Sequence, residues 1–247
     1  MACRLILKEL RPKKKNQIHY AQYSHLQLGV PGLRRIARWS RGDKPYLLLK
    51  LFEAYFDSIL CAFTRHSWKR LLRERQITQI SLRNNVQAKI INLYFKEKYD
   101  IVISIGPMII SSNVLRVCGK ILNLHNAKLP EFGGLSNEVW VRYFDQDTIC
   151  STLHTMTVKL DCGVVLQSSS ASIYTDWSIL RTNMENCRLS GRLLQDFLAN
   201  SKSIPELKSE ADIESTCRSI PSRQIMYELK RRNIKLLRLS DLKPLYD

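Results

Sequence analysis

Two runs of mostly apolar residues, each ended by turn-forming or polar residues, constrain the fold of this chain more than any other feature. Residues 99–106 read YDIVISIG, and residues 120–126 read KILNLHN. Such runs are typical of strands that are buried on both faces of a parallel sheet. The residues between them, 111–120, have the spacing of a short helix. Strand, helix and strand in this order predict an α/β fold built on a mostly parallel sheet.

The same alternation extends over residues 77–200, which we expect to fold as one unit. Its further predicted elements are a strand at 77–81, helices at 84–99, 138–147 and 175–200, and two strands within 150–170. In open parallel sheets, ligands bind beyond the carboxyl ends of the strands. For the two apolar runs these ends are Gly106-Pro107 and His125-Asn126, so this edge of the sheet is where we expect a binding site.

The regions on either side of this unit differ from it in charge. The formal net charge is +17, and residues 1–80 alone hold 17 basic and 5 acidic side chains. We therefore expect a basic, mainly helical N-terminal region at 1–76. Residues 201–247 are expected to form a C-terminal extension with a basic helix and a terminal strand. A field of this sign attracts polyanions, such as nucleic acid, anionic lipid or phosphorylated small molecules.

Residues 46–76 carry apolar side chains at helical spacing, which allows two interpretations. In the first, the helix packs on the next unit and its charges stay in water. In the second, it is an amphipathic surface helix whose Lys69, Arg70, Arg73 and Arg75 face anionic lipid or phosphate. The two interpretations are compatible.

Seven cysteines are spread widely along the chain, with no CxxC pair and no zinc-finger spacing. We interpret them as reduced thiols and expect no metal. No run reaches the ~18 apolar residues of a membrane span. These features predict a cytoplasmic protein, and the basic helix adds the option of peripheral contact with a membrane surface.

The residues that indicate a chemistry are Asn123-x-His125 at a strand end, Leu129-Pro130 after it, and Asp161-x-Gly163 further on. Asp161 follows His125 by 36 residues. This pattern resembles the formyltransferases that use 10-formyltetrahydrofolate, which include glycinamide ribonucleotide, methionyl-tRNA and sugar-nucleotide N-formyltransferases. The likeness covers about residues 77–200. It implies a Rossmann-like sheet of the formyltransferase type, a formyl-transferring enzyme and a folate co-substrate.

The resemblance also implies which residues form the site. The catalytic residues would be Asn123, His125 and Asp161. One wall of the folate site would be the loop that contains Val158, Lys159, Leu160 and Gly163, and the opposite wall would be formed by Gly106, Met108 and Ile109. In this loop, Gly163 would let the backbone approach a planar ligand closely. We interpret His154, the other histidine in this region, as a packing residue of its strand.

The three catalytic side chains suit formyl transfer on chemical grounds as well. An amine attacks the formyl carbon, and negative charge develops on the formyl oxygen. The Asn123 amide N–H can stabilise that oxyanion. His125 can share this role or pass a proton, because the pKa of histidine lies near working pH. Asp161 would orient His125 and relay the proton of the amine, through water.

Two departures from the family pattern concern the acceptor side. Gly133 replaces a common arginine and Asn137 replaces a common proline, which predicts a different acceptor pocket. The first residues show no Gly-rich turn after a strand, so the first βαβ unit of the family is expected to be missing, shortened or replaced by the basic helices.

Several functions stay open at this level. The favoured acceptor is a phosphorylated amine, an amino sugar on a nucleotide or lipid carrier, because basic residues suit diphosphates. Initiator tRNA is disfavoured, since only 47 residues follow Asn200. A formyltetrahydrofolate hydrolase would use the same triad with water in place of the amine. The remaining alternative is a non-catalytic relative that binds either nucleic acid or a membrane. Of these two partners, nucleic acid is not favoured.

Overall fold

The computed structural model describes most of the chain. The described residues are 5–6, 9–10, 18–23, 43–63, 68–75, 77–82, 86–97, 99, 101–105, 110–118, 121–200 and 214–241. Their helices are α3 (Lys44–Phe63), α4 (Trp68–Glu74), α5 (Val86–Glu97), α6 (Ser112–Cys118), α7 (Asn137–Tyr143), α8 (Ile179–Asn200), α9 (Arg223–Arg231) and the 3-10 helix η1 (Leu239–Asp241). Their strands are β1 (Ile18–Tyr23), β2 (Ile77–Leu82), β3 (Val102–Ile105), β4 (Ile121–His125), β5 (Gly133–Gly134), β6 (Thr148–Thr155), β7 (Val165–Ser172) and β8 (Cys217–Arg218).

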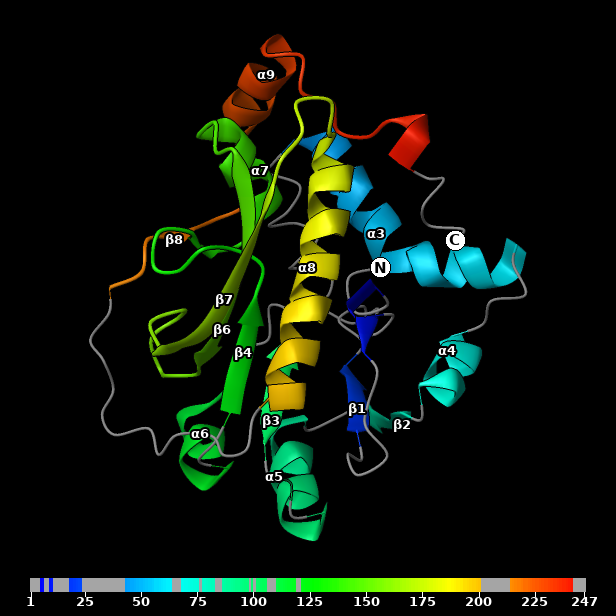
Figure 1. The fold of residues 1–247 in the computed structure, drawn as a ribbon, viewed down its shortest axis with the longest axis vertical. Coiled ribbons are helices and arrows are strands. Elements are labelled where there is room, and N and C mark those ends of the chain that lie inside the picture. Colours follow the sequence, from blue (N-terminus) through cyan, green and yellow to red (C-terminus); the bar gives the residue numbers. More distant parts are fainter. Residues whose placement is uncertain are drawn as a thin grey trace.

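The predicted α/β alternation is confirmed, and it centres on a four-stranded sheet in the order β3-β4-β6-β7 (Figure 1). Strands β3 and β4 are parallel, as expected for the two apolar runs. Strand β6 runs antiparallel to both β4 and β7. Residues 156–164 join β6 directly to β7, and a loop this short cannot make the crossover that a parallel pair needs. Among the described residues, the further pairs β1-β2 and β5-β8 are both parallel.

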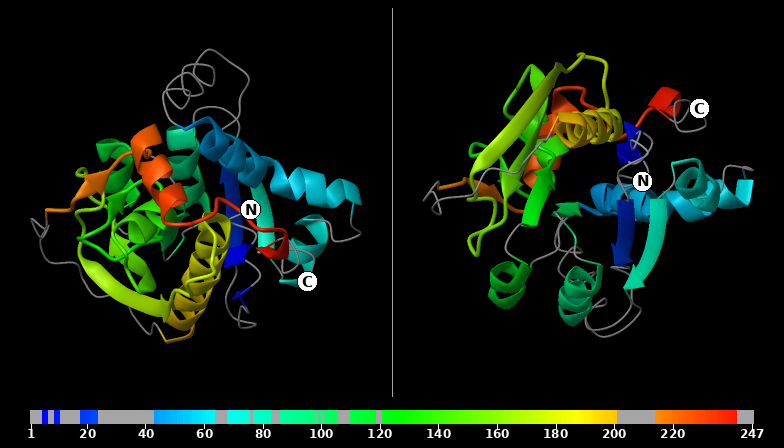
Figure 2. Two further views of the ribbon diagram at one scale, coloured as in Figure 1. Left: turned by 90° about the horizontal axis from the view of Figure 1, so that it is seen from above. Right: turned by 60° about the horizontal axis from the view of Figure 1, so that its bottom comes forward.

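Helices cover both sides of β3 and β4. Helix α8 lies across one side, and α5 and α6 lie on the other (Figure 2). The buried face of α8 carries apolar residues at helical spacing, among them Leu180, Met184 and Cys187, and it packs into one core with Leu122, Leu124 and Leu153 of the sheet. A fully buried aliphatic side chain of this kind contributes roughly 1.5–3 kcal/mol. Strands β4 and β6, which carry the site, are therefore held firmly between two layers.

The N-terminal region contains more than the helices expected there. The sequence predicts one long helical stretch over 46–76, and the structure has two helices, α3 and α4. It also has strand β1, which pairs in parallel with β2 along its whole length. The same core cluster includes Leu5, Ile6 and Leu10 near the N-terminus. The described residues of the N-terminal region thus share a core with the residues that follow.

Residues 232–238 do not form the terminal strand that the sequence suggested. The carbonyl groups of Lys235 and Leu236 instead accept hydrogen bonds from the N–H groups of Ile179 and Leu180, both at 2.9 Å. These N–H groups lie at the start of α8 and have no partner within the helix. The segment therefore caps α8 rather than adding to a sheet.

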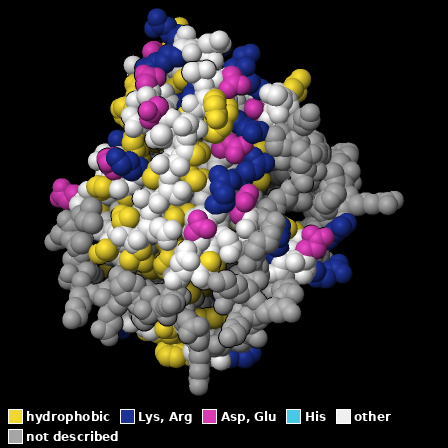
Figure 3. All heavy atoms as spheres, viewed as in Figure 1, with side chains coloured by type: hydrophobic (Ala, Val, Ile, Leu, Met, Phe, Trp, Pro, Cys, Tyr) yellow, Lys and Arg dark blue, Asp and Glu magenta, His cyan; other side chains and the backbone are white. Residues whose placement is uncertain are grey.

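Charges of both signs lie together on the face of the molecule viewed in Figure 1, as Figure 3 shows. On α8, Glu185 forms ion pairs with Arg181 at 2.7 Å and with Arg188 at 2.6 Å. In the basic helix α4, Arg70 pairs with Glu74 at 2.7 Å, while the side chain of Lys69 lies outside the described residues. Within the described part of the chain, no helix combines the length and apolar character that a bilayer crossing requires.

Candidate active site

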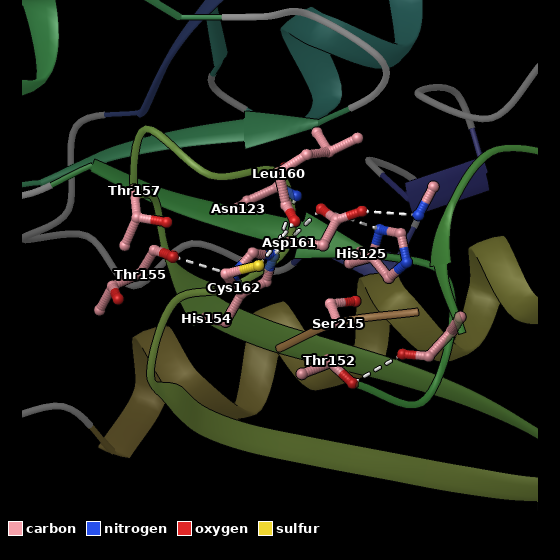
Figure 4. A network of polar contacts seen from close by, with 12 residues as sticks. Asn123, His125, Thr152, His154, Thr155, Thr157, Leu160, Asp161, Cys162 and Ser215 are labelled. Carbon is pink, nitrogen blue, oxygen red and sulfur yellow. Dashed lines mark hydrogen bonds and ion pairs between the residues drawn. The ribbon is translucent and has the colours of Figure 1, made fainter. Parts of the chain in front are cut away.

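Asn123 and His125 lie on β4 and point to the same side of the sheet, because they are two residues apart on a strand. Strand β6 runs antiparallel to β4 beside them, and its register sets His154 opposite Asn123 and Thr152 opposite His125. The loop that follows β6 brings Asp161 over the same point (Figure 4). Strand pairing and one loop therefore gather an amide, two imidazoles and a carboxylate.

The three residues predicted to be catalytic lie together and are buried. One oxygen of Asp161, Oδ1, lies 3.7 Å from His125 Nδ1 and 3.8 Å from His154 Nε2. Its other oxygen, Oδ2, accepts a hydrogen bond from the Gly134 N–H at 2.7 Å. One carboxylate oxygen is thus held by a backbone N–H, and the other oxygen faces both histidines.

Asp161 has a left-handed backbone conformation with φ 55°, which is uncommon for a residue other than glycine. Gly163, two residues on, lets the loop return tightly to its strand. A Cβ atom at this position would lie 1.7 Å from the Thr155 carbonyl oxygen of β6. We expected Gly163 to give a ligand room, and the structure shows that its missing side chain makes room for β6 itself.

The hydrogen bonds of His125 define its neutral tautomer. Its Nε2 lies 2.8 Å from the Phe132 carbonyl oxygen. A carbonyl oxygen can only accept, so Nε2 carries the hydrogen and the Nδ1 lone pair faces Asp161. Asn137 Nδ2 packs 3.2 Å from Nε2, but both atoms carry hydrogen in this tautomer, so the contact is one of packing and not a second hydrogen bond. His125 therefore presents a free basic nitrogen to the same space that the carboxylate faces.

His154 holds the Asn123 side chain in place. Its Nδ1 lies 2.8 Å from the Thr155 carbonyl oxygen and so carries the hydrogen. Its Nε2 then accepts a hydrogen bond from Asn123 Nδ2 at 3.1 Å. Burial, and after it the neighbouring His125, lower the pKa of His154 to about 4, so the ring is neutral near pH 7.

Sequence reasoning missed four contributors to this arrangement: His154, Asn137, Gly134 and the Phe132 carbonyl. We interpreted His154 as a packing residue rather than as the active histidine, and the structure places it against a predicted catalytic residue. The antiparallel register of β4 and β6 was the signal that could have found it. Gly134 has φ 91° and packs against the Arg218 backbone, where a Cβ would meet the carbonyl oxygen at 2.1 Å.

The residues predicted to contact folate are only partly visible. Val158, Lys159 and Leu160 are exposed on the loop before Asp161, with 72% of Val158 and 54% of Leu160 accessible. Their contact with folate stays a prediction. Gly106, Met108 and Ile109 lie outside the described residues. Across the described part of the chain, no group of His, Cys, Asp and Glu side chains is arranged to hold a metal ion.

Comparison with solved structures finds likenesses in formyl-group enzymes. Phosphoribosylglycinamide formyltransferase from Streptococcus pneumoniae TIGR4 is 19% identical with a TM-score of 0.48, over 55% of this chain and 81% of that one. Formyltetrahydrofolate deformylase from Pseudomonas syringae pv. tomato is 18% identical with a TM-score of 0.45, over 53% and 48%. The N-formyltransferase from Helicobacter canadensis, in complex with folinic acid and dTDP-3-aminofucose, is 15% identical with a TM-score of 0.43, over 64% and 55%.

These structures carry the names of the family that the Asn-x-His and Asp-x-Gly motifs resemble. No family model matches the chain, and no curated protein matches it. The function proposed below rests on the residues of the site and their geometry, and not on these likenesses.

Proposed function

We propose that this protein is an N-formyltransferase that moves a formyl group from 10-formyltetrahydrofolate to an amine. The observation that carries the proposal is the convergence of Asn123 and His125, at the end of β4, with Asp161, which follows His125 by 36 residues in the sequence. An amide donor, a histidine with a free Nδ1 and a carboxylate beside it are the groups that acyl transfer to an amine requires.

The proposed reaction uses each side chain once. The acceptor nitrogen bonds to the formyl carbon, and the carbonyl electron pair moves to the formyl oxygen. Asn123 Nδ2 carries two hydrogens, and one remains for this oxygen while the other binds His154. His125 Nδ1 takes the proton of the amine, and Asp161 stabilises the imidazolium that forms. The bond from carbon to the folate nitrogen then breaks, and that nitrogen receives the proton.

We infer further that the acceptor is an amino sugar attached to a nucleotide or a lipid carrier. The basic excess of residues 1–80 suits a diphosphate, and it also suits an anionic membrane surface on which a lipid carrier would be met. The wide spacing of the cysteines supports a reaction in the cytoplasm, where thiols stay reduced. Release of tetrahydrofolate with no acceptor present would point instead to a hydrolase.

The test is a donor assay with 10-formyltetrahydrofolate and a panel of amino-sugar nucleotides, in which release of tetrahydrofolate is followed. We expect Asn123→Ala to lower kcat about 100-fold, the usual cost of removing one oxyanion donor. His125→Ala and Asp161→Ala should abolish measurable turnover. Lys128→Ala is a matched control, because this side chain is exposed and pairs only with Glu131 among the contacts described. Turnover that persists undiminished in the His125 or Asp161 variant would defeat the assignment.

A further inference from the structure

Helix α3, in the N-terminal region, reaches the catalytic part of the molecule through a buried cluster of charges. Lys50 Nζ lies 2.6 Å from Glu138 Oε1 and 2.9 Å from Glu53 Oε2. The Tyr46 hydroxyl donates a hydrogen bond to the same Glu138 oxygen at 2.7 Å. On the far side, Asn183 of α8 donates to Glu53 Oε1 at 3.0 Å. Only 6% of Glu138 and 8% of Glu53 are exposed, so water contributes little to either carboxylate.

The ionisation of this cluster is set by its own members. Burial alone would raise the pKa of Glu138, but Lys50 and Tyr46 outweigh it and the pKa is lowered. Burial alone would lower the pKa of Lys50, but Glu138 and Glu53 outweigh it and the pKa is raised well above its ordinary value. The cluster therefore holds a charged pair at neutral pH. A buried pair of this kind tolerates little movement, because separating its members leaves a charge without compensation.

Glu138 lies in the first turn of α7, directly after Asn137, whose side chain reaches His125 Nε2 at 3.2 Å. This end of α7 lacks the usual local support. Ser136 precedes the helix with φ 61° and makes no side-chain capping hydrogen bond. The Asn137 Oδ1 is buried without a hydrogen-bond partner. The contacts of Glu138 with α3 therefore add support to the start of α7, and with it to the side chain beside His125.

We propose that Lys50 and Tyr46 of α3 are positioning residues for His125, acting through Glu138 and Asn137. They hold the first turn of α7 so that Asn137 stays packed against the His125 ring, which keeps Nε2 directed at the Phe132 carbonyl oxygen and the lone pair of Nδ1 toward Asp161. The catalytic consequence rests on the proposed function. The orientation and tautomer of His125 are independent of the proposed function, and they are measured separately.

The test combines histidine nitrogen NMR with kinetics on the full chain labelled with ¹⁵N-histidine. The variants are Asn137→Ala, Lys50→Met and Tyr46→Phe, with Lys128→Met as the matched control, since it breaks an exposed ion pair with Glu131. In the wild type and the control, His125 should show one sharp signal pair with hydrogen on Nε2. In the three variants that signal should broaden or gain the other tautomer. We expect kcat to fall about 10-fold to 100-fold, as when a supporting residue is lost, with an unchanged KM for the folate donor.

A conservative double variant separates positioning from folding. In Lys50→Gln/Glu138→Gln, an amide pair replaces the ion pair and can keep a hydrogen bond between the two helices without a buried charge. We expect it to recover most of the His125 signal and of kcat that Lys50→Met loses. If Lys50→Met does not fold, Tyr46→Phe and Asn137→Ala carry the test, because each removes only polar atoms at one end of the chain of contacts.

The outcomes distinguish this proposal from the proposed function. A His125 signal that stays unchanged in folded Asn137→Ala and in folded Tyr46→Phe would overturn the positioning role, whatever the activity. The wild type could show no formyl transfer while the variants still change the His125 signal. That result would contradict the proposed function and support the positioning role.

Discussion

At the scale of single residues, the site depends on hydrogen-bond direction. Phe132 and Thr155 present carbonyl oxygens to His125 and His154, and each oxygen decides which ring nitrogen carries the hydrogen. The two histidines consequently differ in role although both are buried. His154 uses its lone pair on Asn123, whereas the lone pair of His125 stays available beside Asp161.

The burial of His154 makes a prediction about stability and pH. The pKa of its ring is about 4 in the folded protein, below the ordinary value of 6.5. The unfolded chain therefore binds an extra proton between these two values, so folding becomes weaker as pH falls below 6.5. At pH 5 this linkage amounts to about 2 kcal/mol relative to pH 7. We expect His154→Gln, which can still accept from Asn123, to remove this share of the loss.

Urea unfolding at pH 7 and pH 5 measures this difference. The informative quantity is the change in unfolding free energy between the two pH values, compared between the wild type and His154→Gln. An equal change in both proteins would show that His154 takes up its proton as readily folded as unfolded, contrary to its burial.

At the scale of elements, the start of α8 is stabilised in part by residues that lie far away in the sequence. The sequence predicts a helix that starts at residue 175, but α8 begins at Ile179 and the residue that caps it is Ser178. The Ser178 hydroxyl accepts from the Arg181 N–H at 3.0 Å and donates to Asp241 at 2.6 Å. The C-terminal residues of the described chain therefore stabilise the start of the longest helix.

Replacing Ser178 by alanine should lower the free energy of unfolding by about 1–2 kcal/mol, because a buried carboxylate loses one donor and the helix loses its cap. Thr175→Ala is the matched control, since this residue is exposed and its side chain makes no capping contact in the described structure. Urea denaturation at pH 7 gives both values. An equally large loss of unfolding free energy in Thr175→Ala would show that Ser178 is not the residue that caps α8.

Strands were predictable to different degrees for physical reasons. Strands β3 and β4 are buried on both faces, so their apolar runs stand out, and Asn123 and His125 could be placed at an edge of the sheet. Strand β1 reads IHYAQY, in which polar and apolar residues mix without a clear period, and it was not predicted. The roles of His154 and Gly134 depend on strand register and on a distant backbone, and neither leaves a local pattern.

At the scale of the whole molecule, the described residues of the N-terminal region pack into the same core as the strands that carry the site. Tyr46, Leu49, Leu71 and Leu72 pack in one cluster with the inner residues of α8 and of strands β4 and β6. Helix α3 also supplies the charges that hold Glu138. The division at residue 76 remains a prediction about organisation, but the packing across it is continuous.

A chain shortened to residues 77–247 should therefore fail to fold cooperatively. It would expose the apolar surface that these N-terminal side chains cover and leave Glu138 without Lys50. Thermal unfolding followed by circular dichroism, beside the full chain, measures this. A sharp transition in the shortened chain, at a temperature near that of the full chain, would show that the catalytic region is autonomous.

The pairing of β8 with β5 has a consequence for the timing of biosynthesis. Gly134, whose N–H holds Asp161, lies against the backbone of Arg218, and the Leu135 N–H donates to the Arg218 carbonyl at 2.8 Å. A nascent polypeptide still attached to the ribosome lacks this support until Arg218 has left the exit tunnel. The carboxylate is thus secured only after synthesis has passed Arg218, long after Asp161 itself has been added to the chain.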